Sequence, residues 1–414
     1  MALFAALVLT VRLAAQEPQE KADETQHYTV QDLGTLGGTF SVAGGINNDG
    51  LVEGFSTLTG DTDTRAFLWQ QGDDDRRSAS GEEKRTGMID LGTLGGSNSD
   101  AASRPSERGE VGGESETSIT DPTLEDFCGY GTNLICLPFL WRDGVMTPLP
   151  TLGGNNGSGY GINDRGEVVG TAENTNTTDP TCSPYPQIKP VIWRKGQVHE
   201  LPTFPGDPDG VAFAINDRGE AVGVSGDCNH VLHALLWRNG KAIDLGSLGG
   251  TRNHYAVDIN NRGQVVGHSN LLGDKIFHAF LWQKGVLTDL GTLSGDVRST
   301  GNGINSKGQV AGGSFDSSGN GRAFLWQDGV MTDLNTLIPP DSPLYLIEAS
   351  GTINDRGQIA RHCLADQHGP RRMPSLRLPQ VGTGPSAKGR RSFYRRMFAS
   401  WFSSDKASAL ELNG

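Results

Sequence analysis

The chain repeats one phrase at nearly regular intervals. The stretches HALLWRNGKAIDLGSLGG (233–250), HAFLWQKGVLTDLGTLSG (278–295) and RAFLWQDGVMTDLNTL (322–337) share an apolar run ending in tryptophan, a glycine turn and a return strand. Six of the seven tryptophans occupy this position: Trp69, Trp141, Trp193, Trp237, Trp282 and Trp326. Since Trp282 and Trp326 are 44 residues apart, the chain builds a unit of about 45 residues several times.

A second phrase alternates with the first. It reads GINDRGEVVG at 161–170 and DINNRGQVVG at 258–267, and it has seven copies if the worn RPSERGEVGG at 104–113 is included. Short apolar or alternating runs separated by glycine turns are typical of antiparallel strands. Each unit is therefore predicted to hold four strands, here called a (…GIN), b (GEVVG), c (AFLW) and d (MTDLGTL).

A four-stranded unit of this length has the size of a β-propeller blade. The chain opens on an isolated d strand at 28–38, and its last unit reaches only a, b and a damaged c. A ring can close if its first strand completes the last blade, whereas an open array needs polar caps. We predict an all-β, seven-bladed propeller closed by residues 28–35; six or eight blades, or an open β-solenoid, are the alternatives.

These phrases resemble the bacterial extracellular HAF-repeat family, named for a tripeptide that stands here as His278-Ala279-Phe280. The resemblance covers residues 28–360. It implies an exported repeat protein and supplies neither a reaction nor a ligand.

The two ends of the chain differ from the repeats. An apolar run at 2–11, followed by Ala14-Ala15, is too short to span a bilayer and is typical of a signal peptide, which predicts secretion or the cell envelope. A disordered start of a cytoplasmic protein is the alternative. The expected segments are a signal-like 1–15, a linker 16–27, the propeller 28–378 and a tail 379–414.

The tail region is basic although the whole chain carries a net charge of −13. Residues 361–414 hold ten Lys and Arg against three Asp and Glu. This pattern suits an amphipathic segment on an anionic surface, a disordered tail, or an altered reading frame, and we favour the last two. The overall charge argues against a nucleic-acid partner.

The cysteines predict disulfides in an exported protein. Two bridges and one leftover thiol, Cys363, account for all five, with free thiols as the alternative. The four bridge candidates are Cys128, Cys136, Cys182 and Cys228.

The sequence contains no motif of a known catalytic or phosphate-binding site. Acidic residues recur in the a–b turn, where Asp and Asn bond the local backbone. A catalytic acid–base pair needs two differently tuned carboxyls, so repetition indicates a scaffold. We predict no catalytic residues, no metal site and no cofactor; Ca²⁺ at GDTDTR (60–65) or GDPDG (206–210) is the open alternative.

The predicted function is an exported binding or interaction module, acting as a monomer on a protein or glycan partner. The alternatives are a propeller enzyme that cleaves polysaccharide or peptide, and a structural envelope or matrix protein. Function tends to reside in variable loops on a rigid scaffold, and the b–c loops vary most. The predicted contact residues on that face are Tyr130, Tyr185, Phe204, Asp207, Asp209 and His230. The six repeat tryptophans are predicted to be core residues between neighbouring blades.

Overall fold

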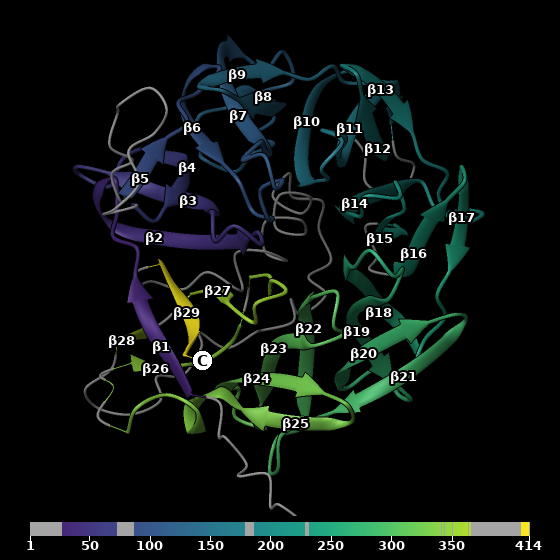
Figure 1. Cartoon of the computed structure of the whole chain (residues 1–414). Coiled ribbons are helices and arrows are strands. Elements are labelled where there is room, and N and C mark those ends of the chain that lie inside the picture. The colour runs from purple at the N-terminus through teal and green to yellow at the C-terminus, as the bar shows by residue number, and fades with distance from the viewer. Residues whose placement is uncertain are drawn as a thin grey trace, which may run out of the picture.

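The computed structural model describes residues 27–72, 87–178, 186–227, 232–340, 342, 344–349, 351–362, 364–365 and 407–413. Six four-stranded antiparallel sheets are arranged as the blades of a propeller (Figure 1). In each blade the strands follow chain order from the inside outwards, so that β13, β17, β21 and β25 lie at the periphery. The all-β propeller prediction is confirmed.

The first three blades are built from residues 37–200. Blade one contains β2 (Gly37–Ile46), β3 (Val52–Leu58), β4 (Thr64–Gln70) and β5 (Gly87–Asp90). Blade two contains β6 (Gly95–Asp100), β7 (Val111–Thr120), β8 (Leu134–Arg142) and β9 (Val145–Pro148). Blade three contains β10 (Gly153–Ile162), β11 (Val168–Thr178), β12 (Pro186–Arg194) and β13 (Gln197–Glu200).

The other three blades are built from residues 209–333. Blade four contains β14 (Asp209–Ile215), β15 (Ala221–Gly226), β16 (Leu232–Arg238) and β17 (Lys241–Asp244). Blade five contains β18 (Gly249–Ile259), β19 (Val265–Leu271), β20 (Phe277–Gln283) and β21 (Val286–Gly291). Blade six contains β22 (Arg298–Ile304), β23 (Val310–Phe315), β24 (Gly321–Gln327) and β25 (Val330–Asp333).

The prediction of seven blades is wrong, because the described residues form six four-stranded blades. The last repeat unit contributes an a–b turn and one b strand, β27 (Ile359–His362), but no regular c and d strands of its own among the described residues. A three-stranded sheet of order β1–β29–β27 contains β1 (His27–Asp32) and β29 (Ala407–Asn413). The closing role of residues 28–35 stays a prediction, because β1 pairs with β29, a strand from the tail region, and not directly with β27.

Short elements also lie outside the four-stranded blades. A 3₁₀ helix, η1 (Leu334–Thr336), follows β25, and β26 (Leu344–Tyr345) pairs with β28 (Leu364–Ala365). Within the described ranges, no helix has the length and hydropathy needed to cross a membrane.

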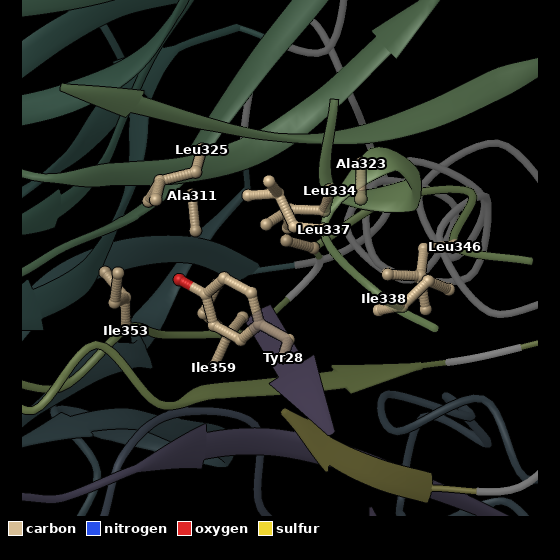
Figure 2. Packing of buried hydrophobic residues seen from close by; sticks show 11 residues of the cluster. Tyr28, Ala311, Ala323, Leu325, Leu334, Leu337, Ile338, Leu346, Ile353 and Ile359 are labelled. Atoms are coloured by element: carbon tan, nitrogen blue, oxygen red, sulfur yellow. The ribbon is translucent and has the colours of Figure 1, made fainter. Parts of the chain in front are cut away.

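Tyr28 anchors β1 to the sixth blade. Its ring lies in a buried cluster between blade six and the segment around the last a–b turn, close to Ile359 (Figure 2). The Tyr28 N–H donates to the carbonyl of Leu337 at 2.7 Å, and burial raises the pKa of the phenol to about 12. The first strand is thus held by an apolar cluster as well as by its pairing with β29.

The repeat tryptophans pack between neighbouring blades. Trp237 lies in a cluster with Val169 and Ile192 of blade three, and its indole N–H donates to the Pro202 carbonyl at 2.7 Å. Trp193 donates in the same way to Pro150. Five of the six are at most 9% exposed, and Trp326 is half-buried against the blade-five cluster.

The a–b turns join the units into a ring of hydrogen bonds. Asn216 is representative: its Oδ1 accepts from two N–H groups of its own turn, and its Nδ2 donates to the carbonyl of Asn260 in the next blade at 3.1 Å. The ring passes through the turn after blade six, because Asn354 Nδ2 donates to the Asn47 carbonyl at 2.8 Å. Side chains of this motif therefore connect the last unit to the first.

Candidate functional site

The first strands of the blades surround the axis of the propeller, and one position in each unit lines a chamber there, here called the inner chamber. This position precedes the turn Asn (Ser in blade two) by three residues. Its seven occupants all face the chamber: Gly44, Ser103, Tyr160, Phe213, Val257, Asn302 and Gly351. Blades three to five therefore present bulky apolar side chains, whereas the rest of the ring presents small or polar ones.

The bulky side forms an aromatic arc. Tyr160 and Phe213 meet edge to face with ring centroids 5.9 Å apart. In blade five, Tyr255 stacks on His268 at 4.6 Å, and His268 lies 5.4 Å from Phe277. Aromatic side chains supply a large contact area with a defined geometry, so the arc is a platform on one wall of the chamber.

Burial keeps the titratable groups of this wall uncharged. It lowers the pKa of His268 to about 3, so the imidazole is neutral at physiological pH. It also raises the pKa of the Tyr255 phenol well above its ordinary value. The aromatic arc is therefore an electrically neutral surface.

Arg104 and Asp258 mark the floor of the chamber. Arg104 of blade two reaches across the axis of the propeller, and its guanidinium donates to the carbonyl of Ile259 in blade five at 3.3 Å. Burial raises the pKa of Asp258, whereas Arg104 and two backbone N–H groups lower it. Those N–H groups, of Ile259 and Ile304, donate to the two carboxylate oxygens at 2.8 and 2.9 Å.

A second chamber lies beyond this floor, at the level of the a–b turns. Its walls are polar and include Arg104, Glu107, Asp164, Asp217 and Asp355. The backbone of the preceding unit occupies the turn carboxylates, for example through the Glu107 N–H that donates to Asp164 at 2.7 Å. The acidic turn residues thus serve the ring itself, as their repetition indicates.

The structure brings together only part of the predicted loop-face set. Phe204 stacks on His233 at 3.9 Å, and Asp207 Oδ2 lies 2.9 Å from His233 Nδ1 and 2.5 Å from the Ser225 hydroxyl, which donates to it. Asp209 is buried, and its carboxylate accepts from the Ile188 N–H at 2.9 Å.

Tyr130 is half-buried in the insertion between β7 and β8. The remaining loop-face residues, Tyr185 and His230, lie outside the described residues, as do Cys182, Cys228 and Cys363. The predicted surface is therefore described only in part.

Two further loop predictions can be located. Cys128 and Cys136 form a disulfide in the blade-two insertion, with Cα atoms 6.0 Å apart. In the stretch 60–65, Asp61 accepts hydrogen bonds from Thr39 and Thr57 at 2.6–2.9 Å, which is the bonding of a turn carboxylate.

The residues of the inner chamber were missed by reasoning from the sequence. The predicted contact surface lies on the variable loops, and no ligand contact was expected from the a strands. Aligning the seven units on the turn Asn would have shown that the position three residues earlier varies from glycine to tyrosine. Variation at one point of a repeated strand is the signal that could have found them.

Comparison with family models and with curated proteins finds no match. Among solved structures, the chain is similar to the Pyrococcus horikoshii acylaminoacyl peptidase, with 11% identity, a TM-score of 0.45, and 78% of this chain aligned. The chain spans about half of that peptidase, 48% of its length.

Two other similar structures are a propeller domain and a lectin by name. The β-propeller domain of the Trilobed protease from Pyrococcus furiosus aligns over 72% of this chain and 98% of its own, at 11% identity and a TM-score of 0.41. A mutant of the Aleuria aurantia lectin, solved with Fucα1-6GlcNAc, aligns over 77% and 98%, at 10% identity and a TM-score of 0.33. Likenesses this distant carry no information on function.

Proposed function

We propose that this protein is a binding module that takes its ligand into the inner chamber of the propeller. The observation that carries the proposal is the asymmetry of the chamber wall. In a ring of near-identical units, Tyr160, Phe213 and Val257 face Gly44 and Gly351 at the same repeat position. An asymmetric apolar pocket with few polar groups is the usual form of a small-ligand site.

The chemistry of the wall supports binding over catalysis. A general acid or base needs a pKa near the working pH and a free atom to exchange a proton. Both oxygens of Asp258 accept backbone hydrogen bonds, and His268 has a pKa near 3. The imidazole of His268 is therefore not poised for proton transfer near neutral pH.

The proposal includes export of a monomeric HAF-repeat protein to the envelope or the exterior. The disulfide between Cys128 and Cys136 supports this, because structural disulfides persist mainly in oxidising compartments. The predicted loop-face residues, among them Phe204 and Asp207, would then form the outer part of the contact surface.

A screen of the full chain against glycans, peptides and small neutral compounds tests the function, with binding measured by calorimetry and hydrolysis assayed in parallel. Replacing Tyr160 and Phe213 together with alanine should weaken a bound ligand at least about tenfold, since each ring supplies apolar contact. Val145→Ala, on an exposed outer hairpin, is the matched control. Turnover of a glycan or peptide would instead support the enzyme alternative. Binding that only Tyr130 and Phe204 variants weaken would place the site on the loops.

A further inference from the structure

Two buried polar atoms in the chamber wall have no hydrogen-bond partner among the described residues. They are Nδ1 of His268 and Oδ1 of Asn302. An unsatisfied buried polar atom costs about 1–3 kcal/mol, and such atoms are rare in native proteins. Both residues line the same chamber, so a ligand that enters it can supply the missing partners.

The orientation of Asn302 is set by its other atoms. Its Nδ2 donates to Glu348 Oε1 and to the carbonyl of Ala349, both at 2.9 Å. Because both partners are acceptors, flipping the amide would place its oxygen against two oxygens. The Oδ1 atom is therefore kept as an acceptor that still needs a donor.

The two unpaired atoms restrict the chemistry of the ligand. Asn302 Oδ1 can only accept, whereas His268 Nδ1 accepts or donates according to its tautomer. A hydroxyl group suits either case, because it is both donor and acceptor. A carboxylate cannot donate to Asn302 Oδ1, and an ammonium bonds to His268 only in the tautomer whose Nδ1 accepts.

The walls also select against charge. The carboxylate of Asp258 is already bonded to two N–H groups, and the guanidinium of Arg104 is directed to the Ile259 carbonyl. A charged ligand among Phe213, Tyr255 and Val257 would lose its water against apolar side chains, which is costly. The space between the lining residues is open to solvent at its mouth.

On the basis of the proposed function, we propose that the chamber binds an uncharged, hydroxyl-bearing ring, namely one neutral sugar residue. The apolar face of the sugar lies on the aromatic arc of blades three to five. Its hydroxyls bond to Asn302 and His268, which are covered in the ligand-free chain and are reached by a small shift of the side chains. Apolar contact then provides affinity, and the two hydrogen bonds provide specificity.

Calorimetry on the full chain tests this with three sets of probes: methyl glycosides of neutral hexoses and N-acetylhexosamines, the charged sugars glucuronate and glucosamine, and benzyl alcohol as an aromatic alcohol. At least one neutral glycoside should bind. His268→Phe keeps the stack on Tyr255 and removes the polar atom, so it should weaken that glycoside about tenfold, the effect of one hydrogen bond. Val257→Trp and, from the opposite wall, Ser103→Leu fill the chamber and should abolish binding, whereas Val145→Ala should not change it.

The outcomes separate the ligand class from the site. If only charged sugars or benzyl alcohol bind, and the filling variants abolish that binding, the sugar proposal is overturned while the proposed function stands. Glycoside binding that persists in folded Val257→Trp and Ser103→Leu proteins overturns both. Unchanged affinity in His268→Phe overturns the assigned role of the imidazole.

Discussion

The hydrogen-bond ring of the a–b turns leads to a sharp stability prediction at Asn216. This side chain is 1% exposed and makes four hydrogen bonds. Its Oδ1 accepts from the N–H groups of Arg218 and Glu220, each at 3.0 Å. Its Nδ2 donates to Glu220 Oε2 at 2.7 Å and to the Asn260 carbonyl at 3.1 Å. Asn216→Ala removes all four.

The expected loss follows from these bonds. A typical intramolecular hydrogen bond contributes about 0.5–1.5 kcal/mol to stability, and a buried group left unpaired costs more. Glu220 keeps its ion pairs with Arg218 and Arg238, so its carboxylate is not left unpaired when the bond to Asn216 is lost. We expect Asn216→Ala to lower the free energy of unfolding by about 3 kcal/mol, measured by urea denaturation.

Blade two provides the matched comparison. There a serine replaces the turn Asn, and Ser106 Oγ accepts from the Glu110 N–H at 3.1 Å. Asn216→Ser should keep one bond of this type and lose the donor to Asn260, with a loss between those of wild type and Asn216→Ala. If the serine variant is as stable as wild type, the bond between blades contributes nothing. If the alanine variant loses less than about 1 kcal/mol, the whole account of the ring is wrong.

Four further predictions concern a core tryptophan, a buried acid, the blade-two disulfide and the first strand. Trp282→Ala, at a 6% exposed site, should cost about 3–5 kcal/mol in urea denaturation, and a much smaller loss would contradict its core role. Burial raises the pKa of Glu53 from 4.5 to about 8, so the folded chain keeps a proton that the unfolded chain releases. Stability should therefore fall as pH rises from 4.5 to about 8, by up to about 1.4 kcal/mol per pH unit, and Glu53→Gln should remove that slope unless the assignment is mistaken. Non-reducing mass mapping should find the Cys128–Cys136 bridge, which two free thiols would refute. Deletion of 28–35 should lower the melting temperature sharply, because it removes the partner of β29 and the Tyr28 cluster, and an unchanged value would exclude a closing role.

The architecture of the blades was predictable because the apolar runs and glycine turns of each unit mark its strands. The run before Trp282 became β20, and the glycine turn after it became the hairpin to β21. The predicted number of blades was wrong because the repeat pattern does not continue through the last unit. Beyond Ala360 the repeat is lost, and β29 lies in sequence that shares nothing with strand c. No local pattern could show that residues 407–413 pair with β1.

Contacts between repeat positions explain why the chamber wall does not stand out among the recurring motifs. The residue that follows the turn glycine pairs with the residue that follows the tryptophan. The types of these two residues change together from blade to blade. Blades two to four use a glutamate and an arginine, as in Glu167 with Arg194, whereas blades five and six use two glutamines, as in Gln264 with Gln283. Such positions must match a neighbour, so their sequence is restricted.

The position three residues before the turn Asn is free of this restriction. Its side chain points to the centre of the ring, where the seven units converge and no repeated partner has to be matched. It holds glycine at 44, tyrosine at 160 and asparagine at 302. At Gly44 a Cβ would lie 2.9 Å from the Cα of Ala102, so glycine is needed there, whereas Tyr160 and Phe213 pack in one apolar cluster. In a ring of repeats, a shared position whose residue differs between units is where a specific site can arise. For this chain that reasoning leads to the inner chamber, ahead of the loops, as the first surface to test.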